Sequence, residues 1–189
     1  MQQIAIFASG AGSNAAKIID YFISAKKQIT VSLIVCNNPN AGVLKIAASY
    51  NIATLLIDKE PFFKGDAYLP QLQEMNIDFI VLAGFLWKIP EKIITAYTNR
   101  MINIHPALLP KYGGKGMYGD KVHTAVLNNK ETQSGITIHF VNKHYDEGEI
   151  IFQATCPVDK NDTPETLAKK IHALEHKHYS AIIDTILSQ

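Results

Sequence analysis

Asn103 and His105 stand two positions apart near the end of an apolar run that begins at Met101. Side chains two positions apart on an extended backbone point to the same side, so this amide and this imidazole would face one cleft. Pro106 then bars His105 from the helical region of backbone conformations. The pair therefore places a donor that can polarise a carbonyl group beside a group that can carry a proton.

Asp146 follows a second apolar run, Gly135–Val141. A carboxylate close to His105 would favour the imidazolium and raise its pKa above the ordinary value of about 6.5. The same carboxylate could relay a proton, directly or through water. The alternative is that Asp146 is only a turn residue in the Asp-Glu-Gly sequence at positions 146–148.

A glycine-rich loop, Gly10–Asn14, lies between an apolar run and a segment with helical spacing. Glycines let the backbone approach an anion closely, and the amides at a helix start point toward it. Ser13 and Asn14 add side-chain donors. The loop therefore predicts a phosphate site, with a plain tight turn capped by Ser or Asn as the alternative.

A dinucleotide site is a second alternative for this loop, because Gly10, Gly12 and Ala15 fit the pattern G-x-G-x-x-G/A. In such sites an acidic residue beyond the second strand binds the adenosine ribose. Here the second apolar run ends at Cys36 and continues with two asparagines. We therefore disfavour NAD.

Three blocks of the sequence, at residues 9–14, 103–112 and 139–148, resemble the folate-dependent formyltransferases. Their order and separation fit this family from residue 2 to about residue 185. The first block resembles in particular the members that act on phosphoribosylglycinamide (GAR). The resemblance implies transfer of a formyl group to the amine of GAR, a step of de novo purine synthesis. The donor would be 10-formyltetrahydrofolate, a co-substrate, with no permanently bound cofactor.

The resemblance also implies roles for the three residues described first. Attack of the amine on the formyl carbon gives a tetrahedral oxyanion, to which Asn103 would donate a hydrogen bond. His105, in its protonated state, would stabilise the same charge. Asp146 would pair with His105 and pass the amine proton toward the leaving nitrogen.

Binding residues follow from the resemblance in the same way. Gly12, Ser13 and Asn14 would bind the GAR phosphate, and Glu175 its ribose, unless Glu175 is only a solvated helical carboxylate. Relatives often have Asn where this chain has Ala11. The expected folate-binding residues are Leu86, Trp87, Lys88, Ile89, Asn103, His139, Val141, Asn142, Lys143, His144 and Tyr145.

The roles of three features near the expected site stay open. Better-known relatives commonly have Arg at the position of Trp87, so the side-chain roles of Trp87 and Lys88 are undecided. His139 is equally compatible with a buried structural role. The glycine-rich segment 111–119 is either a flap that borders the substrate phosphate or closes over the site, or a plain surface loop.

Apolar runs alternate with segments of helical spacing along the chain, which predicts βαβ units. The expected strands are Ile4–Ala8, Val31–Cys36, Ala53–Leu56, Phe79–Ala83, Met101–Ile104, Gly135–Val141 and Ile150–Pro157. The expected helices are Asn14–Phe22, Val43–Tyr50, Asp66–Met75, Glu91–Tyr97, a segment after His123 that ends at Asn129, and a last helix capped by Thr163 with Pro164 at its first position.

The predicted fold class is α/β: a doubly wound, mostly parallel sheet with helices on both faces, Rossmann-like, ending in a strand-loop-strand extension. We expect one formyltransferase domain over residues 1–189, with a phosphate-binding part at about 1–100 and a folate-binding and catalytic part at about 80–189. Ligands of such sheets bind beyond the carboxyl ends of the strands, where the loops after the first, fourth and fifth strands should converge.

Composition limits the other classes of function. The 189 residues are 47% hydrophobic and 19% charged, with a net charge of +1, which disfavours nucleic-acid and membrane-surface partners. No apolar stretch approaches the roughly 20 residues that span a bilayer, and the first residues do not read as a signal peptide. We expect a cytoplasmic protein with reduced Cys36 and Cys156.

A metal site is not expected, although His172 and His176 are spaced i and i+4 on the last helix with His178 nearby. No cysteine or carboxylate cluster completes a tetrahedral set, and a solvated or substrate-facing helix end is the better interpretation.

The alternatives within formyl-group chemistry are formyltransferases acting on methionyl-tRNA or a sugar amine, and a formyltetrahydrofolate hydrolase. A folate- or nucleotide-binding module without catalysis is the alternative outside it. The sequence leaves a monomer and a homodimer equally open.

Overall fold

The computed structural model describes residues 1–25, 28–64 and 67–188. The strands in these residues are β1 (Gln2–Phe7), β2 (Ile29–Cys36), β3 (Ala53–Leu56), β4 (Phe79–Leu82), β5 (Met101–His105), β6 (Gln133–Phe140) and β7 (Ile150–Pro157). The helices are α1 (Ser13–Ala25), α2 (Gly42–Ser49), α3 (Lys59–Lys64), α4 (Leu69–Glu74), α5 (Glu91–Ala96), α6 (Asp120–Asn128) and α7 (Pro164–Leu187).

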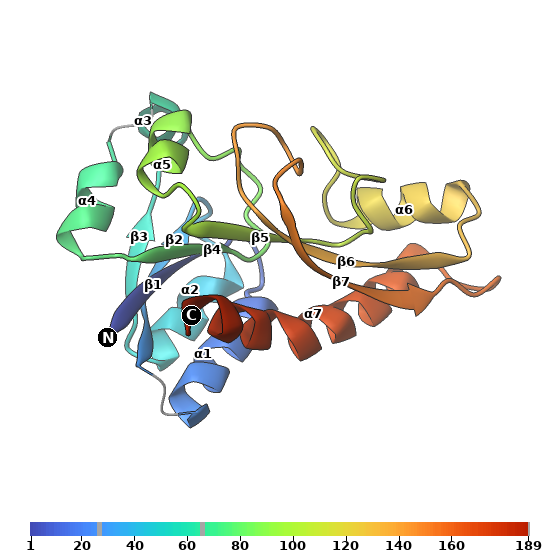
Figure 1. Cartoon of the computed structure of the whole chain (residues 1–189), viewed down its shortest axis with the longest axis horizontal. Helices are drawn as coiled ribbons and strands as arrows, with labels where there is room; N and C mark the ends of the chain where they lie inside the picture. Colours follow the sequence, from blue (N-terminus) through green and yellow to red (C-terminus); the bar gives the residue numbers. More distant parts are fainter. Residues whose placement is uncertain (26–27, 65–66, 189) are drawn as a thin grey trace.

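The strands form one sheet in the order β3-β2-β1-β4-β5-β6-β7 (Figure 1). The first five strands in this order are parallel, and β6 and β7 continue the sheet antiparallel. The chain winds from β1 outward to β3 and then returns to β4 on the other side of β1. The predicted doubly wound, mostly parallel sheet with a strand-loop-strand extension is therefore confirmed, and its topological switch point lies at the carboxyl ends of the adjacent strands β1 and β4.

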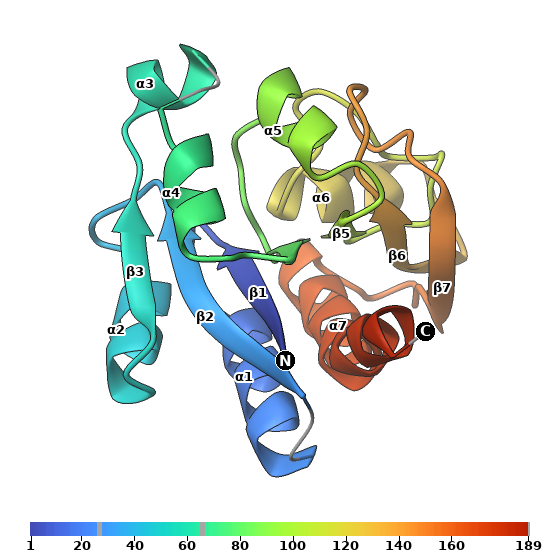
Figure 2. The ribbon, with the colours of Figure 1, turned by 60° about the vertical axis from the view of Figure 1, so that its left-hand side comes forward.

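Helices cover both faces of the sheet (Figure 2). Side chains of α1, α2 and α7, such as Ile18, Val43 and Ile171, pack in one core cluster. Side chains of α3, α4 and α5, such as Phe62 and Ile93, pack in the other. Because each parallel strand is covered on both sides, β1 needs apolar side chains at successive positions, which explains its continuous apolar run.

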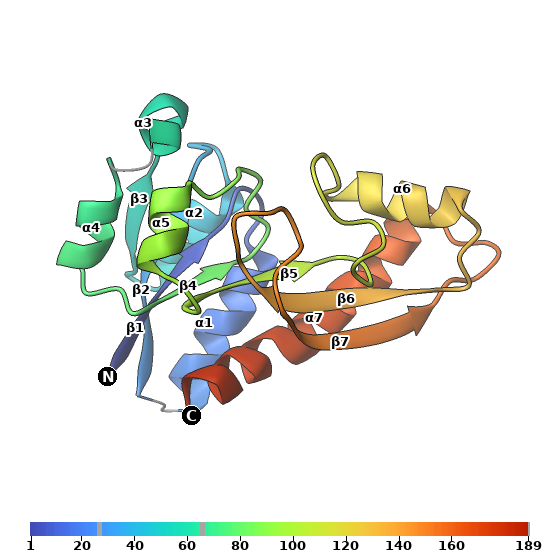
Figure 3. The same ribbon diagram turned by 45° about the horizontal axis from the view of Figure 1, so that its top comes forward.

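The extension formed by β6 and β7 lies beyond β5, where α6 packs beside the first part of α7 (Figure 3). The register between β5 and β6 pairs Asn103 with His139 and His105 with Thr137. Ile102 and Ile104 point from β5 into one core cluster, whereas Asn103 and His105 lie on the opposite face of the strand. The register thus fixes which side chains meet at the end of β5.

Some element boundaries differ from the sequence prediction. Helix α3 was not expected, because six residues give too few repeats for a helical period to be recognised. The helix expected at Asp66–Met75 is the shorter α4, and Asp66 itself lies outside the described residues. Helix α6 already begins at Asp120, before the residues after which a helix was expected.

Candidate active site at the switch point of the sheet

The loops that follow β1 and β4 are tied together at the switch point. The amide of Ser9 donates to the carbonyl oxygen of Gly84 at 3.1 Å, and the amide of Leu86 donates to the hydroxyl of Ser9 at 2.9 Å. A cavity of about 620 Å³ opens beyond these loops and extends to the end of β5. The convergence expected for the ends of these three strands is thus present.

Nearly all residues singled out from the sequence line this cavity. They are Gly12, Ser13, Asn14, Leu86, Trp87, Lys88, Ile89, Asn103, His105, His139, Val141, Asn142, His144, Tyr145, Asp146 and Glu175. Lys143 instead lines a smaller adjoining cavity of about 170 Å³, next to Lys88 and Phe63.

His105 is buried, and each of its ring nitrogens has a distinct neighbour. Its Nε2 lies 2.8 Å from the carbonyl oxygen of Tyr112, which only accepts, so Nε2 carries a proton. Its Nδ1 lies 3.6 Å from Oδ2 of Asp146. Burial lowers the pKa of His105, and the opposing effects of Asp146 and the Tyr112 carbonyl are smaller. The expectation of a pKa above the ordinary value is therefore wrong, and the free protein holds a neutral imidazole.

Asp146 occupies the loop between β6 and β7 with a φ of 55°, in the left-handed region that Asp and Asn tolerate better than most residues. The amide of Gly114 donates to its Oδ2 at 2.9 Å, and Nε2 of His139 lies 3.7 Å from its Oδ1. Burial acts to raise the pKa of Asp146, but His139, His105 and the Gly114 amide together lower it. Asp146 is therefore a carboxylate at neutral pH, held against two histidines.

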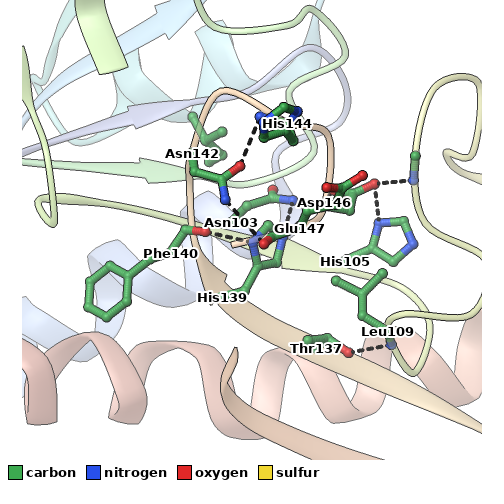
Figure 4. Close-up of polar contacts among 12 residues, drawn as sticks. Asn103, His105, Leu109, Thr137, His139, Phe140, Asn142, His144, Asp146 and Glu147 are labelled. Atoms are coloured by element: carbon green, nitrogen blue, oxygen red, sulfur yellow. Dashed lines mark hydrogen bonds and ion pairs between the residues drawn. The ribbon is translucent and has the colours of Figure 1, made fainter. Parts of the chain in front are cut away.

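Asn103 is oriented by His139, its partner in the β5–β6 register. Nδ1 of His139 lies 2.8 Å from the carbonyl oxygen of Phe140 and must donate to it, so in the tautomer protonated at Nδ1 the ring offers Nε2 as an acceptor. Nδ2 of Asn103 lies 3.2 Å from that Nε2 and donates one of its two protons (Figure 4). The second N–H of the amide is left for a ligand, and His139 combines the structural role with a place in the cavity wall.

Thr137 holds the segment that follows His105. Its hydroxyl donates to the carbonyl oxygen of Ala107 at 2.7 Å and accepts from the amide of Leu109 at 3.0 Å. The side-chain amide nitrogen of Gln153 also donates to the Thr137 hydroxyl, at 2.8 Å. Sequence reasoning missed this threonine, because nothing in the strand pattern separates it from other inward residues of β6.

The other end of the cavity is built by the glycine-rich loop and two helices. Gly12 has a φ of 81°, and an added Cβ would lie 2.7 Å from Cβ of Val43, so this position requires glycine. Nδ2 of Asn14, in α1, donates to Oε2 of Glu175, in α7, at 2.9 Å. Glu175 is only 5% exposed, which excludes a solvated carboxylate.

His172 also reaches this carboxylate, with Nδ1 2.9 Å from Oε2 of Glu175. This hydrogen bond raises the pKa of His172, and burial opposes it. His123, in α6, lines the same part of the cavity. His172 agrees with the substrate-facing alternative given above for this end of the last helix, and its i, i+3 spacing from Glu175 is the local signal for their contact. His123 was not singled out from the sequence as a site residue.

The folate side of the predicted site has apolar and aromatic walls. Leu86 is 53% exposed at the mouth of the cavity. Trp87 packs against Phe62 and Phe63, with ring centroids 5.8 and 5.6 Å apart, so its indole joins an aromatic cluster. Nζ of Lys88 lies 5.3 Å from the ring centroid of Tyr145, which connects the loop after β4 to the loop of Asp146.

Within residues 1–25, 28–64 and 67–188, no three His, Cys, Asp or Glu side chains are grouped so that they could hold a metal ion. The rings of His172 and His176 stack 6.3 Å apart, while His178 packs against Phe152. Both cysteines are free. No helix in the described part of the chain is long and apolar enough to cross a membrane.

The fold and the site together define a protein of the α/β class whose cavity brings together an amide donor, a neutral histidine and a carboxylate at the switch point of a doubly wound sheet, an arrangement suited to group transfer at a carbonyl centre. Comparison with known proteins narrows this class. The chain belongs to the formyl transferase family, whose sequence profile matches residues 2–183. The family resemblance seen in the three sequence blocks is therefore confirmed.

Individual relatives agree with this assignment. The chain is 41% identical over 193 residues to "Phosphoribosylglycinamide formyltransferase, chloroplastic" of Arabidopsis thaliana, and it covers 66% of that protein. It covers 62% of the relative from Vigna unguiculata, so it spans less than two thirds of both plant proteins. It is 33% identical over 191 residues to the phosphoribosylglycinamide formyltransferase of Bacillus subtilis. This match covers 99% of this chain and 95% of the Bacillus subtilis protein.

A solved structure shares the whole fold. The crystal structure of phosphoribosylglycinamide formyltransferase from Bacillus halodurans superposes with a TM-score of 0.91 at 34% sequence identity. The match covers 100% of this chain and 96% of the other. The Rossmann-like arrangement of the sheet and its helices is therefore that of solved formyltransferases.

Proposed function

We propose that this protein transfers the formyl group of 10-formyltetrahydrofolate to the amine of GAR, in de novo purine synthesis. The observation that carries the proposal is one cavity with two chemically different ends. Asn103, His105 and Asp146 meet at the end of β5, and the loop Gly10–Asn14 with Glu175 forms the other end. The names of the relatives point to the same substrate.

The two ends suit the two ends of GAR. The amides of the glycine-rich loop and the start of α1 suit its phosphate, and Glu175 suits the ribose hydroxyls. With these groups bound there, the amine would extend toward His105. The folate would lie along Leu86–Ile89 and Val141–Tyr145, with its formyl group between the amine and Asn103.

The chemical step follows from the states of the three side chains. The free N–H of Asn103 donates to the formyl oxygen and stabilises the oxyanion as the amine attacks. The new bond joins the amine nitrogen to the formyl carbon, and the bond that breaks joins this carbon to N10 of the folate. Overall, one proton leaves the amine and one arrives at N10.

His105 is the carrier we propose for this proton. Its lowered pKa leaves Nδ1 unprotonated, so that this nitrogen can accept the amine proton. The imidazolium that forms is stabilised by Asp146 at 3.6 Å and by the Tyr112 carbonyl, and it stands beside the oxyanion. It then protonates N10 as the tetrahedral intermediate collapses.

Methionyl-tRNA and sugar-amine formyltransferases and a formyltetrahydrofolate hydrolase remain the alternatives. The phosphate-type loop joined to Glu175 favours a small phosphorylated amine over all three. We further propose a single domain with a phosphate-binding part at about 1–100 and a folate-binding and catalytic part at about 80–189. We also propose that its partners are small molecules only and that it is a monomer or a homodimer. The two free cysteines are consistent with the cytoplasmic location that we propose.

An absorbance assay tests the function. The protein is incubated with a 10-formyl folate donor, with and without GAR, and release of deformylated folate is followed. We expect release only with GAR. Release without any amine would identify a hydrolase, and release with a sugar amine but not with GAR would identify that alternative.

The same assay tests the three side chains. Asn103→Ala, His105→Ala and Asp146→Asn should each lower turnover by about 10²-fold or more, the usual scale for an oxyanion donor or a proton carrier. Glu147→Gln is the matched control, because this neighbouring carboxylate is exposed and lies outside the cavity wall. Near-normal turnover in one of the three variants would remove that residue from the mechanism.

A further inference from the structure

The neutral ring of His105 can carry its proton on either nitrogen, and the proposed reaction needs it on Nε2. Nδ1 faces Oδ2 of Asp146 at 3.6 Å (Figure 4), and Nε2 faces the carbonyl oxygen of Tyr112 at 2.8 Å. Both neighbours are hydrogen-bond acceptors, so they compete for the one ring proton. A proton on Nδ1 would block the nitrogen that is proposed to take the amine proton. The tautomer therefore decides whether His105 can act as a base.

Residues 112–114 act on both sides of this competition. The carbonyl group of Tyr112 accepts from Nε2, and the amide of Gly114 donates to Oδ2 of Asp146 at 2.9 Å. This is the same oxygen that lies 3.6 Å from Nδ1, beyond hydrogen-bond distance. An added Cβ on Gly113 would lie 3.2 Å from Cβ of Asp146, so the segment packs directly against this residue. One short piece of backbone thus draws the ring proton to Nε2 and occupies the oxygen that would draw it to Nδ1.

The backbone of Tyr112 has an unusual conformation where its carbonyl group meets His105. Its φ is 59°, in the left-handed region, which costs free energy for a bulky residue. A residue keeps such a conformation only where the surrounding structure holds it. The Tyr112 side chain supplies such a hold, because its hydroxyl donates to Oε1 of Glu131, 19 positions further along the chain, at 2.9 Å. Nζ of Lys111 donates to the same oxygen at 2.8 Å.

We propose that Glu131 is a positioning residue that sets the tautomer of His105 through Tyr112. The hydrogen bond between the Tyr112 hydroxyl and Glu131 keeps residues 112–114 in place, and the Tyr112 carbonyl then holds the ring proton on Nε2. Without this bond, Tyr112 can leave the left-handed conformation, and Asp146 can take a hydrogen bond from a protonated Nδ1. Glu131 itself is not part of the cavity wall. The tautomer is a property of the protein without substrate, whereas its consequence for catalysis rests on the function proposed above.

Three variants and a control test this role. Tyr112→Phe removes the hydroxyl and keeps the carbonyl group, Glu131→Ala removes the acceptor, and Glu131→Gln keeps an acceptor oxygen in its place. Tyr50→Phe is the matched control, because the Tyr50 hydroxyl also donates to a carboxylate, that of Asp20, and its ring packs against the same core cluster as that of Tyr112.

The tautomer is read directly by NMR. Each protein carries isotope-labelled histidine, and the chemical shifts of the two ring nitrogens show which one is protonated when the ring is neutral. The signals of His105 are those that disappear in His105→Ala. The kcat and the KM values for GAR and for the folate donor are measured in the same proteins.

We expect the parent and Tyr50→Phe to carry the His105 proton on Nε2. Tyr112→Phe and Glu131→Ala should move it at least in part to Nδ1. They should also lower kcat about tenfold or more, with KM values close to those of the parent, because a displaced proton carrier affects the chemical step rather than binding. Glu131→Gln should restore both the tautomer and kcat. A merely structural role of Glu131 would change stability and leave the tautomer as it is.

Two outcomes overturn the inference. One is a proton that remains on Nε2 in Tyr112→Phe and in Glu131→Ala, whatever happens to kcat, and the other is a parent ring protonated on Nδ1. If the tautomer shifts as expected but the parent does not formylate GAR, the inference stands and only the proposed function fails. Tyr112→Phe loses one oxygen atom from a half-buried side chain, so a folded protein remains for the test even if Glu131→Ala is less stable.

Discussion

The imidazole of His105 lies 3.6 Å from the carboxylate of Asp146 and has almost no access to water. Two effects on its pKa therefore compete. A nearby negative charge favours the imidazolium, whereas burial favours the neutral ring, and burial is the larger effect here. A neutral base in the free protein that becomes an imidazolium during the reaction is what proton transfer from an amine requires.

This balance predicts how His105 titrates. Because its folded pKa lies below the unfolded value of about 6.5, its contribution to stability is complete above that pH and is lost as pH falls from there toward the folded pKa. Asp146→Asn removes the influence that raises the pKa of His105, so the pKa should fall further. The lower limb of the rate-pH profile should move to lower pH with it.

NMR titration of the His105 ring in both proteins measures this shift. Asn is the suitable replacement because it also tolerates the left-handed backbone that Asp146 adopts. A His105 pKa that stays constant or rises in Asp146→Asn would contradict the pairing and leave Asp146 a separate role, such as holding a water molecule.

Helix α7 connects the folding of the chain to the end of the cavity proposed for GAR, because it carries both His172 and Glu175. Thr163 caps its start: the Thr163 hydroxyl accepts from the amide of Thr166, whose side chain accepts from the Thr163 amide. Farther along, the hydroxyl of Tyr179 donates to the carbonyl oxygen of Leu82 at 2.8 Å and fixes the helix to the end of β4. The helix is thus fixed on both sides of Glu175.

Removing the cap should lower stability without touching the site. We expect Thr163→Ala to lower the free energy of unfolding by about 1 kcal/mol, measured by urea denaturation. Thr185→Ala is the matched control, since the hydroxyl of Thr185 donates to the carbonyl oxygen of Ala181, one turn earlier in the same helix. It should change stability by less than about 0.5 kcal/mol. Equal losses in both variants would argue against a special role of the cap.

The main cavity is assembled from distant parts of the chain. Asn14 and Glu175 are 161 positions apart, and their hydrogen bond joins α1 to α7 across the cavity end proposed for GAR. Leu86, after β4, stands at the end proposed for folate. In the proposed function, the whole molecule would therefore present two substrates to each other from opposite ends of one cavity.

This division predicts separable binding defects. Asn14→Ala should weaken GAR binding about tenfold, because it removes a donor to Glu175 and a polar group of the cavity wall, and should leave a folate analogue unaffected. Leu86→Ala should weaken the folate analogue and spare GAR. Isothermal titration of both variants with both ligands measures the four affinities, and parallel losses for the two ligands would mean that the two ends are misassigned.

The sequence by itself determined the order of strands and helices and the presence of the main motifs. The apolar run of β1, the loop Gly10–Asn14 and the alternation of Asn103 and His105 along β5 are local patterns, which backbone geometry translates directly into direction and spacing. Local patterns also predicted the cap at Thr163. Local patterns failed to predict α3, because a helix of six residues shows too little of the helical period to be recognised.

Only the tertiary structure decided the states and partners of the side chains. The neutral form of His105, the hydrogen bond from Asn14 to Glu175 and the aromatic surroundings of Trp87 all arise from residues far apart in the chain. Burial and hydrogen bonding depend on which elements pack together and in what register. A one-dimensional pattern holds no record of those distances, so the electrostatics of the site follow from packing alone.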